Sequence, residues 1–259
     1  AGAAQADSLA ALAERLSRQV AARAPALPEL PESFSIAAPW GSEAPGRLRI
    51  PVALEDMTLE TLHLDLTRSH AVVAGPPASG KSTALATVAA GVAEAAGTPT
   101  FAVGGPGSPL GGIDSWEDAA FARNRHAAVV ERLLAAAEGD YDGSVRAVLF
   151  VDEADDVDEA AARMIEQALR MDAVRVVAAG SPATISKGYS GWLGEIRRNR
   201  SVLLLQPESR AEVEQLTGMK TRFRPGQEFP PGRGVLVADR RAALVQVAES
   251  LVRPAATRS

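Results

Sequence analysis

The sequence predicts an α/β fold in which a mostly parallel sheet is flanked by helices. Three observations point to this fold. Short apolar runs alternate with helical segments along most of the 259 residues, a pattern typical of parallel strands joined by crossover helices. Residues 75–83 fit G-x-x-x-x-G-K-[ST] between a predicted strand and a predicted helix. A later apolar run, residues 147–151, ends on the carboxylates Asp152 and Glu153.

The first 46 residues are predicted to form a helical and proline-rich lead-in. Apolar residues recur at helical spacing within residues 8–23. They predict an amphipathic helix that packs on the body or leads in from an upstream domain. Residues 24–51 contain six prolines, which favour an extended and semi-rigid chain. We place a single α/β domain over residues 47–253 and expect the chain to be a piece of a longer protein.

The domain is predicted to begin with an edge strand. Residues 47–53 alternate apolar and polar side chains, and Pro51 suits an edge because proline cannot donate to a neighbouring strand. Further strands are expected at residues 70–74, 99–103, 145–152, 174–179 and 201–206, and helices at residues 83–96, 116–138 and 160–169. Residues 234–247 contain two short apolar runs around a polar turn, which predict a C-terminal β-hairpin.

The glycine-rich stretch has the composition of a phosphate-binding P-loop. Gly75 and Gly80 let the backbone turn tightly and present bare N–H groups to phosphate oxygens. The helix that begins near Lys81 adds its positive amino end. Lys81 is expected to reach the β- and γ-phosphates, and the Ser82 hydroxyl to ligate Mg²⁺. The predicted nucleotide-binding residues are Gly75, Pro76, Pro77, Ala78, Ser79, Gly80, Lys81, Ser82 and Thr83. A chance match occurs in about one chain in a hundred of this length, and the flanking strand and helix favour the functional interpretation.

The carboxylate pair supplies the second half of a nucleotidase site. Asp152 is expected to hold Mg²⁺ together with Ser82, and Glu153 to orient or deprotonate an attacking water. The competing explanation is an acidic pair that ends a strand and caps the next helix. The candidate catalytic residues are Lys81, Asp152, Glu153 and Ser181, and the cofactors are ATP and Mg²⁺.

Two further features leave alternatives open. Ser181 follows the next predicted strand, where its hydroxyl is either a sensor of the γ-phosphate or part of a strand-ending turn with Pro182. The cluster of Arg197, Arg198 and Arg200 either donates an arginine to a neighbour's active site or is a solvated helix end.

The overall composition excludes several classes of function. The net charge is −5, with 27 basic and 32 acidic residues, so no direct nucleic-acid partner is expected. The sequence contains no cysteine, which removes disulfide and zinc–thiolate sites. The three histidines lie far apart, without metal-ligand spacing.

Several ordered motifs resemble the FtsK/SpoIIIE-type P-loop ATPases, and most closely the EccC/EssC proteins of type VII secretion. The similar stretches are Leu-Pro-Glu-Leu-Pro at 27–31, Ile-Pro-Val-Ala-Leu-Glu-Asp at 50–56, the P-loop, Leu-Leu-Leu-Gln-Pro at 203–207, Pro-Gly-Arg-Gly at 231–234 and Val-Gln-Val-Ala at 245–248. Three positions depart from the family pattern. Ala53 replaces a usual glycine, Ala78 replaces glycine or lysine, and Glu153 replaces a second aspartate.

The resemblance implies a RecA-like P-loop NTPase fold and one module of a multi-ATPase protein, anchored at the cytoplasmic face of the cell membrane by a missing N-terminal part. It implies neighbouring ATPase modules or subunits as partners, with a possible hexamer in the full-length protein. It also implies a secreted helical protein of the WXG class, or its C-terminal signal, as the ligand of a last module.

Two functions therefore stay open: a motor that hydrolyses ATP to drive export, and a nucleotide-binding receptor module with little or no hydrolysis. DNA translocation is the weaker alternative, because the balance of charge is acidic. The C-terminal hairpin, in place of a helical lid, argues against an AAA+ module.

Overall fold

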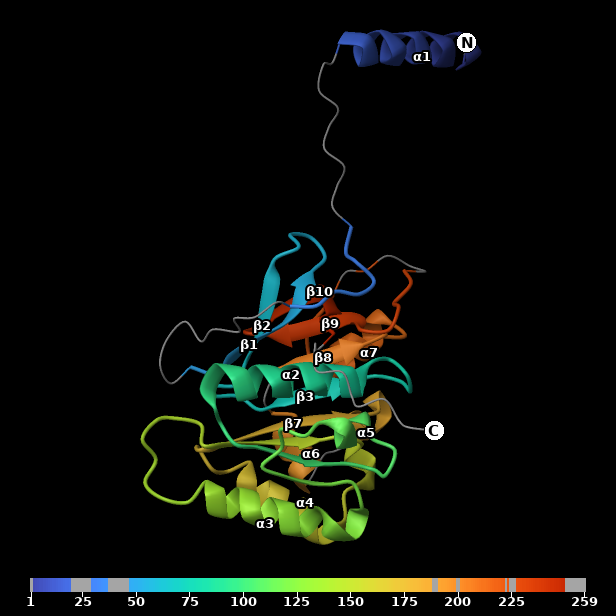
Figure 1. Cartoon of the computed structure of the whole chain (residues 1–259). Helices are drawn as coiled ribbons and strands as arrows, with labels where there is room; N and C mark the ends of the chain where they lie inside the picture. Colours follow the sequence, from blue (N-terminus) through green and yellow to red (C-terminus); the bar gives the residue numbers. More distant parts are fainter. Residues whose placement is uncertain are drawn as a thin grey trace, which may run out of the picture.

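The computed structural model describes residues 2–19, 29–36, 47–187, 191–198, 201–221, 223 and 227–249. A ten-stranded sheet runs through the body in the order β2-β1-β10-β9-β8-β3-β7-β6-β4-β5 (Figure 1). The strands are β1 (Arg49–Glu55), β2 (Thr61–Asp65), β3 (Ala71–Ala74), β4 (Thr100–Val103), β5 (Asp118–Ala120), β6 (Ala147–Val151), β7 (Val174–Gly180), β8 (Val202–Leu205), β9 (Arg233–Ala238) and β10 (Arg241–Val247). The helices are α1 (Gly2–Gln19), α2 (Lys81–Ala96), α3 (His126–Ala136), α4 (Glu159–Ala168), α5 (Pro182–Lys187), α6 (Gly191–Ile196) and α7 (Arg210–Thr217), with short 3₁₀ turns η1 (Pro109–Gly112), η2 (Arg123–Arg125) and η3 (Ala154–Asp156).

The sheet has a parallel part and an antiparallel part. Strands β8, β3, β7, β6, β4 and β5 are parallel neighbours. The C-terminal hairpin of β9 and β10 joins the antiparallel pair β1–β2 to β8. The predicted α/β class, the mostly parallel sheet and the C-terminal hairpin are confirmed. The hairpin closes onto the strand next to β3, so it comes close to the P-loop.

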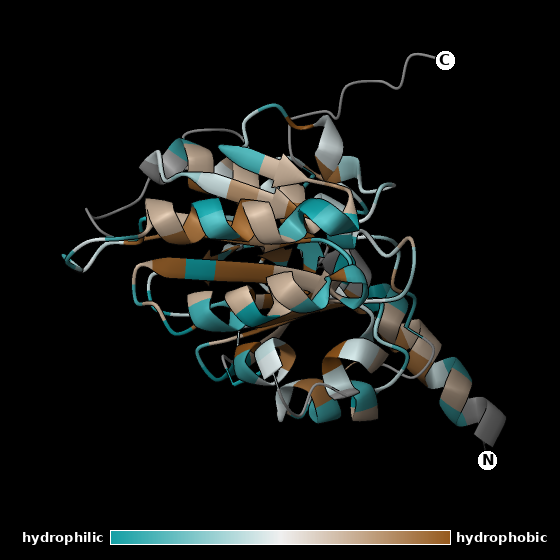
Figure 2. Cartoon of the chain, turned by 90° about the horizontal axis from the view of Figure 1, so that it is seen from below, coloured by the Kyte–Doolittle hydropathy of each residue, from teal (hydrophilic) through white to brown (hydrophobic). Residues whose placement is uncertain are grey.

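Both faces of the sheet are covered, as the alternation of strands and helices predicts. Along β6, Leu149 and Val151 pack into one apolar cluster with α3, α4, α6 and α7, whereas Val148 and Phe150 pack into a second cluster with α2 and β1. All four side chains are fully buried. Figure 2 shows apolar strands of the sheet, in brown, between helices that mix polar and apolar residues.

The prediction that residues 47–53 form an edge strand is wrong. β1 lies between β2 and β10, and β2 is the edge of the sheet. Pro51 is accommodated because the register of β1 against β2 shifts between Pro51 and Ala53, and because the pairing of β1 with β10 runs from Ala53 to Glu55. The ladder therefore does not need the N–H group that proline lacks.

The predicted helix over residues 116–138 is also wrong at its start. Asp118–Ala120 forms β5, which pairs in parallel with β4, and the helix α3 begins only at His126. Trp116 and Phe121 pack against the apolar cluster on one face of the sheet and do not form the face of a helix. The sequence analysis assigned no helix to α5 or α7, and it predicted near α6 only a possible helix end at the arginine cluster.

The N-terminal helix forms but exposes its apolar side chains. Leu9, Leu12 and Leu16 are 64%, 41% and 48% exposed, and Figure 1 draws α1 apart from the body. The alternative in which this helix packs on the body is therefore not realised. Most of the proline-rich stretch lies outside the described residues, as do residues 250–259. None of the described helices combines the length and apolar character that a membrane crossing requires.

Candidate nucleotide-binding site

The predicted P-loop connects β3 to α2 at the carboxyl edge of the parallel strands. Gly75 directly follows β3, and its N–H donates to Gly180 O at the end of β7, at 3.3 Å. Gly80 caps α2 with a φ of 97°, and Ala78 has a φ of 61°. These two left-handed positions turn the chain sharply ahead of the helix. The amino end of the 16-residue helix α2 therefore opens onto the loop, which is the arrangement that binds phosphate.

Lys81 lies against this loop. Its Nζ donates to Pro76 O at 2.8 Å, so the side chain folds back over the residues that would surround a phosphate. Burial lowers the pKa of Lys81, while Asp152, Glu153 and Asp155 act in the opposite direction. The ammonium group is thus partly desolvated beside an acidic cluster, where an anionic ligand gains more from it than in bulk water.

Asp152 is brought to the P-loop by the strand order. β7 lies between β3 and β6, and the carboxylate that follows β6 is only 2% exposed. Asp152 Oδ2 accepts hydrogen bonds from Ser82 Oγ at 2.9 Å and from Ser108 Oγ at 2.6 Å. The two predicted magnesium ligands, Ser82 and Asp152, are therefore in direct contact.

This donor set fits magnesium bound together with a nucleotide. Mg²⁺ in proteins is commonly held by one or two carboxylates, with phosphate and water oxygens completing the octahedron. Among the described residues, no group of three or more His, Asp or Glu side chains could hold a metal ion by itself. The remaining oxygens at Ser82 and Asp152 would therefore come from the nucleotide and from water.

Glu153 differs from its buried neighbour Asp152 in exposure. It is exposed, and its backbone is left-handed with a φ of 62°. A Cβ on Gly105 would collide with Glu153 Oε2, so the carboxylate lies directly over the backbone of the loop that follows β4. The carboxylate is thus accessible at the same edge as Asp152, which is the placement expected of a group that handles water.

The loop over residues 104–109 belongs to the site but had no role in the sequence interpretation. Ser108 contacts Asp152, and Gly104 O lies 3.0 Å from Nε2 of the fully buried His126. A glycine-rich loop at the carboxyl end of a parallel strand was the signal that could have revealed it.

Ser181 and the arginine cluster make other contacts. Ser181 Oγ lies 2.8 Å from Thr184 Oγ1 and accepts from Thr184 N at 3.1 Å, so this hydroxyl caps α5. Arg197 donates to Ser186 O, and Arg198 pairs with Glu195. Arg200 lies outside the described residues. The sensor role of Ser181 stays a prediction.

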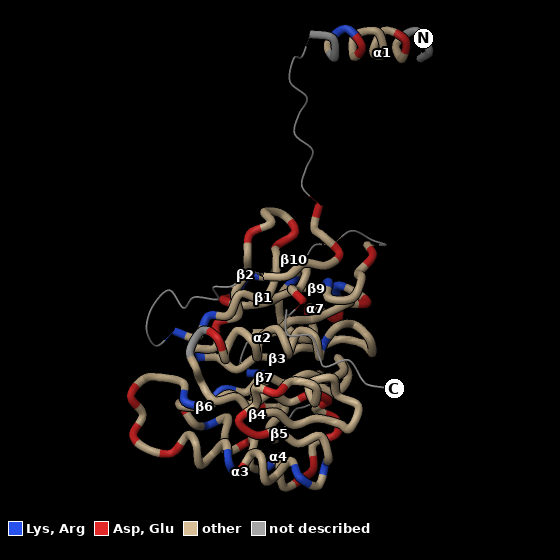
Figure 3. Tube along the Cα trace, in the orientation of Figure 1, with Lys and Arg blue, Asp and Glu red and all other residues tan. Residues whose placement is uncertain are grey.

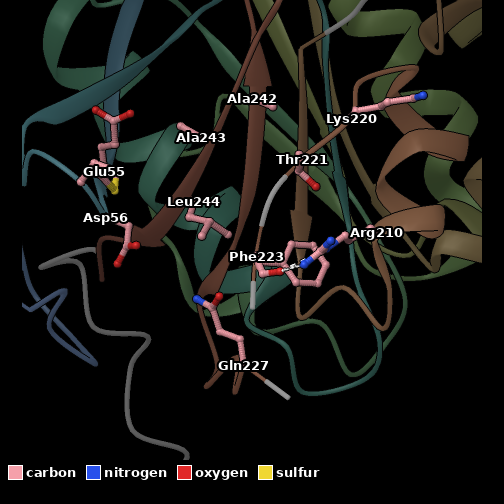
Figure 4. Close-up of a pocket in the computed structure, with 11 residues that line it drawn as sticks. Glu55, Asp56, Arg210, Lys220, Thr221, Phe223, Gln227, Ala242, Ala243 and Leu244 are labelled. Atoms are coloured by element: carbon pink, nitrogen blue, oxygen red, sulfur yellow. Dashed lines mark hydrogen bonds between the residues drawn. The ribbon is translucent and has the colours of Figure 1, made fainter. Parts of the chain in front are cut away.

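A second concave surface lies beside the C-terminal hairpin (Figure 4). It encloses about 680 Å³, and none of residues 75–83 lines it. Its floor includes Leu244 of β10 and Phe223, with Arg210 stacked 5.7 Å from the centre of the Phe223 ring. The acidic side chains Glu55 and Asp56 and the basic side chains of Arg210 and Lys220 stand on opposite sides. We call this surface the hairpin groove.

The sequence matches no protein-family model and no curated protein. Solved structures do resemble it. EccC from Thermomonospora curvata (ATPases 2 and 3), in complex with a signal sequence peptide, aligns with a TM-score of 0.68 and 20% identity over 87% of this chain and 45% of that chain. EssC (ATPases 2 and 3) from Geobacillus thermodenitrificans aligns with a TM-score of 0.61 and 17% identity over 92% of this chain and 49% of that chain. The pCW3 conjugation coupling protein TcpA, solved with ATPγS, aligns with a TM-score of 0.57 and 13% identity over 85% of this chain and 71% of that chain.

The chain spans less than half the length of these two EccC and EssC chains. At sequence identities this low, the structural likeness establishes a shared fold and nothing more specific. The chain therefore has the fold of the EccC and EssC ATPase modules, a RecA-like P-loop NTPase fold.

Proposed function

We propose that this chain is an ATP-binding module of a type VII secretion motor of the FtsK/SpoIIIE type. In this proposal the module couples ATP binding and hydrolysis to the recognition and export of small helical secreted proteins. The observation that carries it is the contact between Ser82 and Asp152 beside Lys81, on a fold that resembles EccC and EssC. The acidic net charge of −5 disfavours the alternative of a DNA translocase. Figure 3 shows basic and acidic residues interspersed along the described chain.

Each residue of the site has a defined task in the proposal. The backbone of residues 75–80 surrounds the phosphates, and Lys81 neutralises charge on the β- and γ-phosphates. Ser82 and Asp152 hold Mg²⁺, which would supply charge stabilisation when bound. Glu153 orients and deprotonates the attacking water, and Ser181 senses the γ-phosphate from the neighbouring strand end.

The proposed setting is a larger, membrane-anchored protein at the cytoplasmic face of the membrane, with neighbouring ATPase modules or subunits as partners. A neighbour would supply the arginine that stabilises the transferred phosphoryl group. The isolated chain is therefore expected to bind ATP well and to hydrolyse it slowly.

Calorimetric titration with Mg-ATP tests the nucleotide site. Lys81→Ala removes a charge-assisted contact and should weaken binding about 10- to 100-fold. Lys220→Ala is the matched control, because Lys220 is exposed and lies near Glu214. Equal binding by the intact protein and by Lys81→Ala would show that the site assignment is wrong.

The second candidate is a nucleotide-binding receptor module with little or no hydrolysis, and the hairpin groove favours it. An apolar floor flanked by charges of both signs suits a short peptide with apolar anchors. The EccC structure that resembles this chain holds a signal sequence peptide. We propose that the groove takes the C-terminal signal of a WXG-class protein.

A fluorescent C-terminal signal peptide, titrated in an anisotropy assay, tests the receptor proposal. Leu244→Gln should weaken peptide binding and leave Mg-ATP binding unchanged, whereas Lys81→Ala should do the reverse. If Leu244→Gln binds the peptide as tightly as the intact protein, the groove is not the receptor site.

A further inference from the structure

The lead-in segment, residues 29–36, is fastened to the C-terminal hairpin. Arg233, the first residue of β9, donates from Nη2 to Leu30 O and Pro31 O, both at 2.8 Å. Beyond the end of β10, Glu249 N donates to Phe34 O at 2.8 Å. Leu30 is only 8% exposed. A stretch that lies about 200 residues earlier in the chain is thus docked at both ends on this hairpin.

Arg233 also holds its partner across the hairpin. Gln246 is directly opposite in the β9–β10 register and is 2% exposed. Arg233 Nε donates to Gln246 Oε1 at 3.2 Å, and Gln246 Nε2 donates to Pro231 O at 3.1 Å. Both ends of the Gln246 amide are therefore hydrogen-bonded. Arg233 sets the orientation of the amide, and the amide in turn holds the loop over residues 230–232.

This loop touches the P-loop itself. Gly232 N donates to Ser79 O at 2.8 Å, and Gly232 O accepts from Val247 N at 2.8 Å. A Cβ on Gly80 would lie 3.2 Å from Gly232 N, and a Cβ on Gly232 would lie 2.7 Å from Gln246 Nε2. The backbone of Gly232 therefore lies close against Gly80, and a shift of the loop over residues 230–232 either moves the carbonyl of Ser79 or breaks its hydrogen bond with Gly232 N.

A second contact joins the same hairpin to the helix of the site. Thr87 Oγ1, on α2, donates to Ala248 O at 2.7 Å, and Ala248 precedes the residue that binds Phe34. Both chains of contacts start at the lead-in segment. The first ends on Ser79 of the P-loop, and the second ends on α2, the helix that begins at Lys81.

We propose that Arg233 is a positioning residue that couples docking of the lead-in segment to the shape of the phosphate-binding loop. The inference rests on the proposed nucleotide binding at Lys81. Docking of residues 29–36 favours the loop geometry that accepts phosphate, and bound nucleotide favours docking in return, because coupling between two sites is reciprocal. The chain that precedes residue 29 can then change nucleotide affinity by pulling this segment away.

Amide hydrogen exchange with mass spectrometry tests the coupling on the intact chain. Mg-ATP should slow exchange in residues 32–36 as well as in residues 76–82. Arg233→Gln should speed exchange in both segments even without nucleotide, and should weaken Mg-ATP binding about fivefold or more, the lower end of typical coupling between sites. Arg233→Lys, which keeps the charge and length but not the forked geometry, should restore part of the affinity.

Two further variants separate coupling from general destabilisation. Leu30→Asp undocks the segment from its other side and should weaken Mg-ATP binding similarly, with no additional loss when combined with Arg233→Gln. Arg241→Gln is the matched control, because Arg241 lies on the same hairpin and pairs with Glu55 instead. It should leave the exchange of residues 76–82 and the affinity unchanged.

The outcomes distinguish this inference from the proposed function. If Arg233→Gln binds Mg-ATP normally and leaves the exchange of residues 76–82 unchanged, the coupling does not exist. If the intact protein binds no Mg-ATP but Arg233→Gln still speeds exchange in both segments, the structural link stands and the proposed function fails.

Discussion

The hydroxyl of Ser82 donates to the carboxylate of Asp152 across 2.9 Å, although the two residues lie 70 positions apart. One follows β3 and the other follows β6, and a single strand, β7, separates them in the sheet. Because parallel strands end at the same edge, the fold brings the loop that surrounds phosphate and the carboxylate into contact. This contact gives the site its expected dependence on magnesium.

Asp152→Asn should remove most of that dependence. The amide keeps the shape of the side chain, so Ser82 and Ser108 retain a partner, but the negative charge that attracts Mg²⁺ is lost. We expect the ratio of ATP affinities with Mg²⁺ and with EDTA to fall about tenfold, the size of one charge-assisted contact. Isothermal titration under both conditions measures it. Asp155→Asn removes an exposed charge from the same acidic run, and a similar fall in that variant would contradict the assignment.

Glu153→Gln should separate binding from hydrolysis. Glu153 is exposed, and glutamine keeps the size of its side chain while removing a charge that acts on Lys81 only through space. Mg-ATP affinity should therefore stay within about twofold, a change of under 0.5 kcal/mol. The hydrolysis rate should fall about 100-fold or more if Glu153 is the general base.

The dependence on protein concentration gives a second readout of hydrolysis. A neighbour's arginine would raise the rate per chain as the concentration of the intact protein increases. A high rate that does not change with concentration would argue that one chain holds a complete active site.

Much of this site could be predicted from the sequence because its chemistry is local. Residues 75–83 carry the loop, its glycines and the lysine in one stretch of sequence. The apolar strand that ends on Asp152 is likewise predicted from a single short stretch. The parallel sheet follows from the alternation of elements. The P-loop and Asp152 come together because β7 lies between β3 and β6. This strand order is not encoded by any local sequence pattern.

The incorrect and missing predictions have the same physical origin as this strand order, namely contacts between residues far apart in the sequence. Pro51 suggested an edge strand, but β10 returns from the far end of the chain to pair with β1 just beyond the proline. Trp116 and Phe121 suggested a helix, but β4 recruits residues 118–120 as a strand. Ser108 was missed because its role depends on a contact with Asp152, 44 residues later. Each of these is a tertiary contact that overrides local propensity.

Gly232→Ala should destabilise the protein more than an ordinary glycine substitution does. Gly232 has a φ of 79°, and a Cβ there would lie 2.7 Å from Gln246 Nε2. Gly97→Ala is the matched control, because Gly97 also has a positive φ, of 56°, but nothing within 4 Å of a new Cβ. Backbone strain alone should cost about 1–2 kcal/mol in both variants. The new methyl group must displace the buried Gln246 amide from Arg233 and Pro231, and the loss of those hydrogen bonds should add about 1 kcal/mol or more to Gly232→Ala.

Urea unfolding of the two glycine variants measures the difference. Gly232→Ala should also weaken Mg-ATP binding, because the hydrogen bond from Gly232 N to Ser79 O is disturbed, while Gly97→Ala should not. Equal losses of stability in the two variants would mean that the Gln246 side chain moves aside without cost.

His70 should make the stability of the fold depend on pH below neutrality. Val176 N donates to His70 Nδ1 at 3.1 Å, and Nε2 lies 3.1 Å from Leu169 O, so the buried ring is neutral with its proton on Nε2. Burial lowers the pKa of His70 from 6.5 to about 4. Between these values the unfolded chain binds a proton that the folded chain excludes. The contribution of His70 is therefore complete above pH 6.5 and is lost as the pH falls to about 4.

The expected loss is about 3 kcal/mol over that range, because each pKa unit corresponds to about 1.4 kcal/mol. Urea unfolding of the intact protein and of His70→Gln, from pH 7.5 to pH 4, measures it as a difference in slope. The variant is less stable at pH 7.5, but its stability should fall less steeply. If the curves of the intact protein and His70→Gln run parallel, the buried histidine accepts its proton without unfolding, and some other group must supply the acid sensitivity.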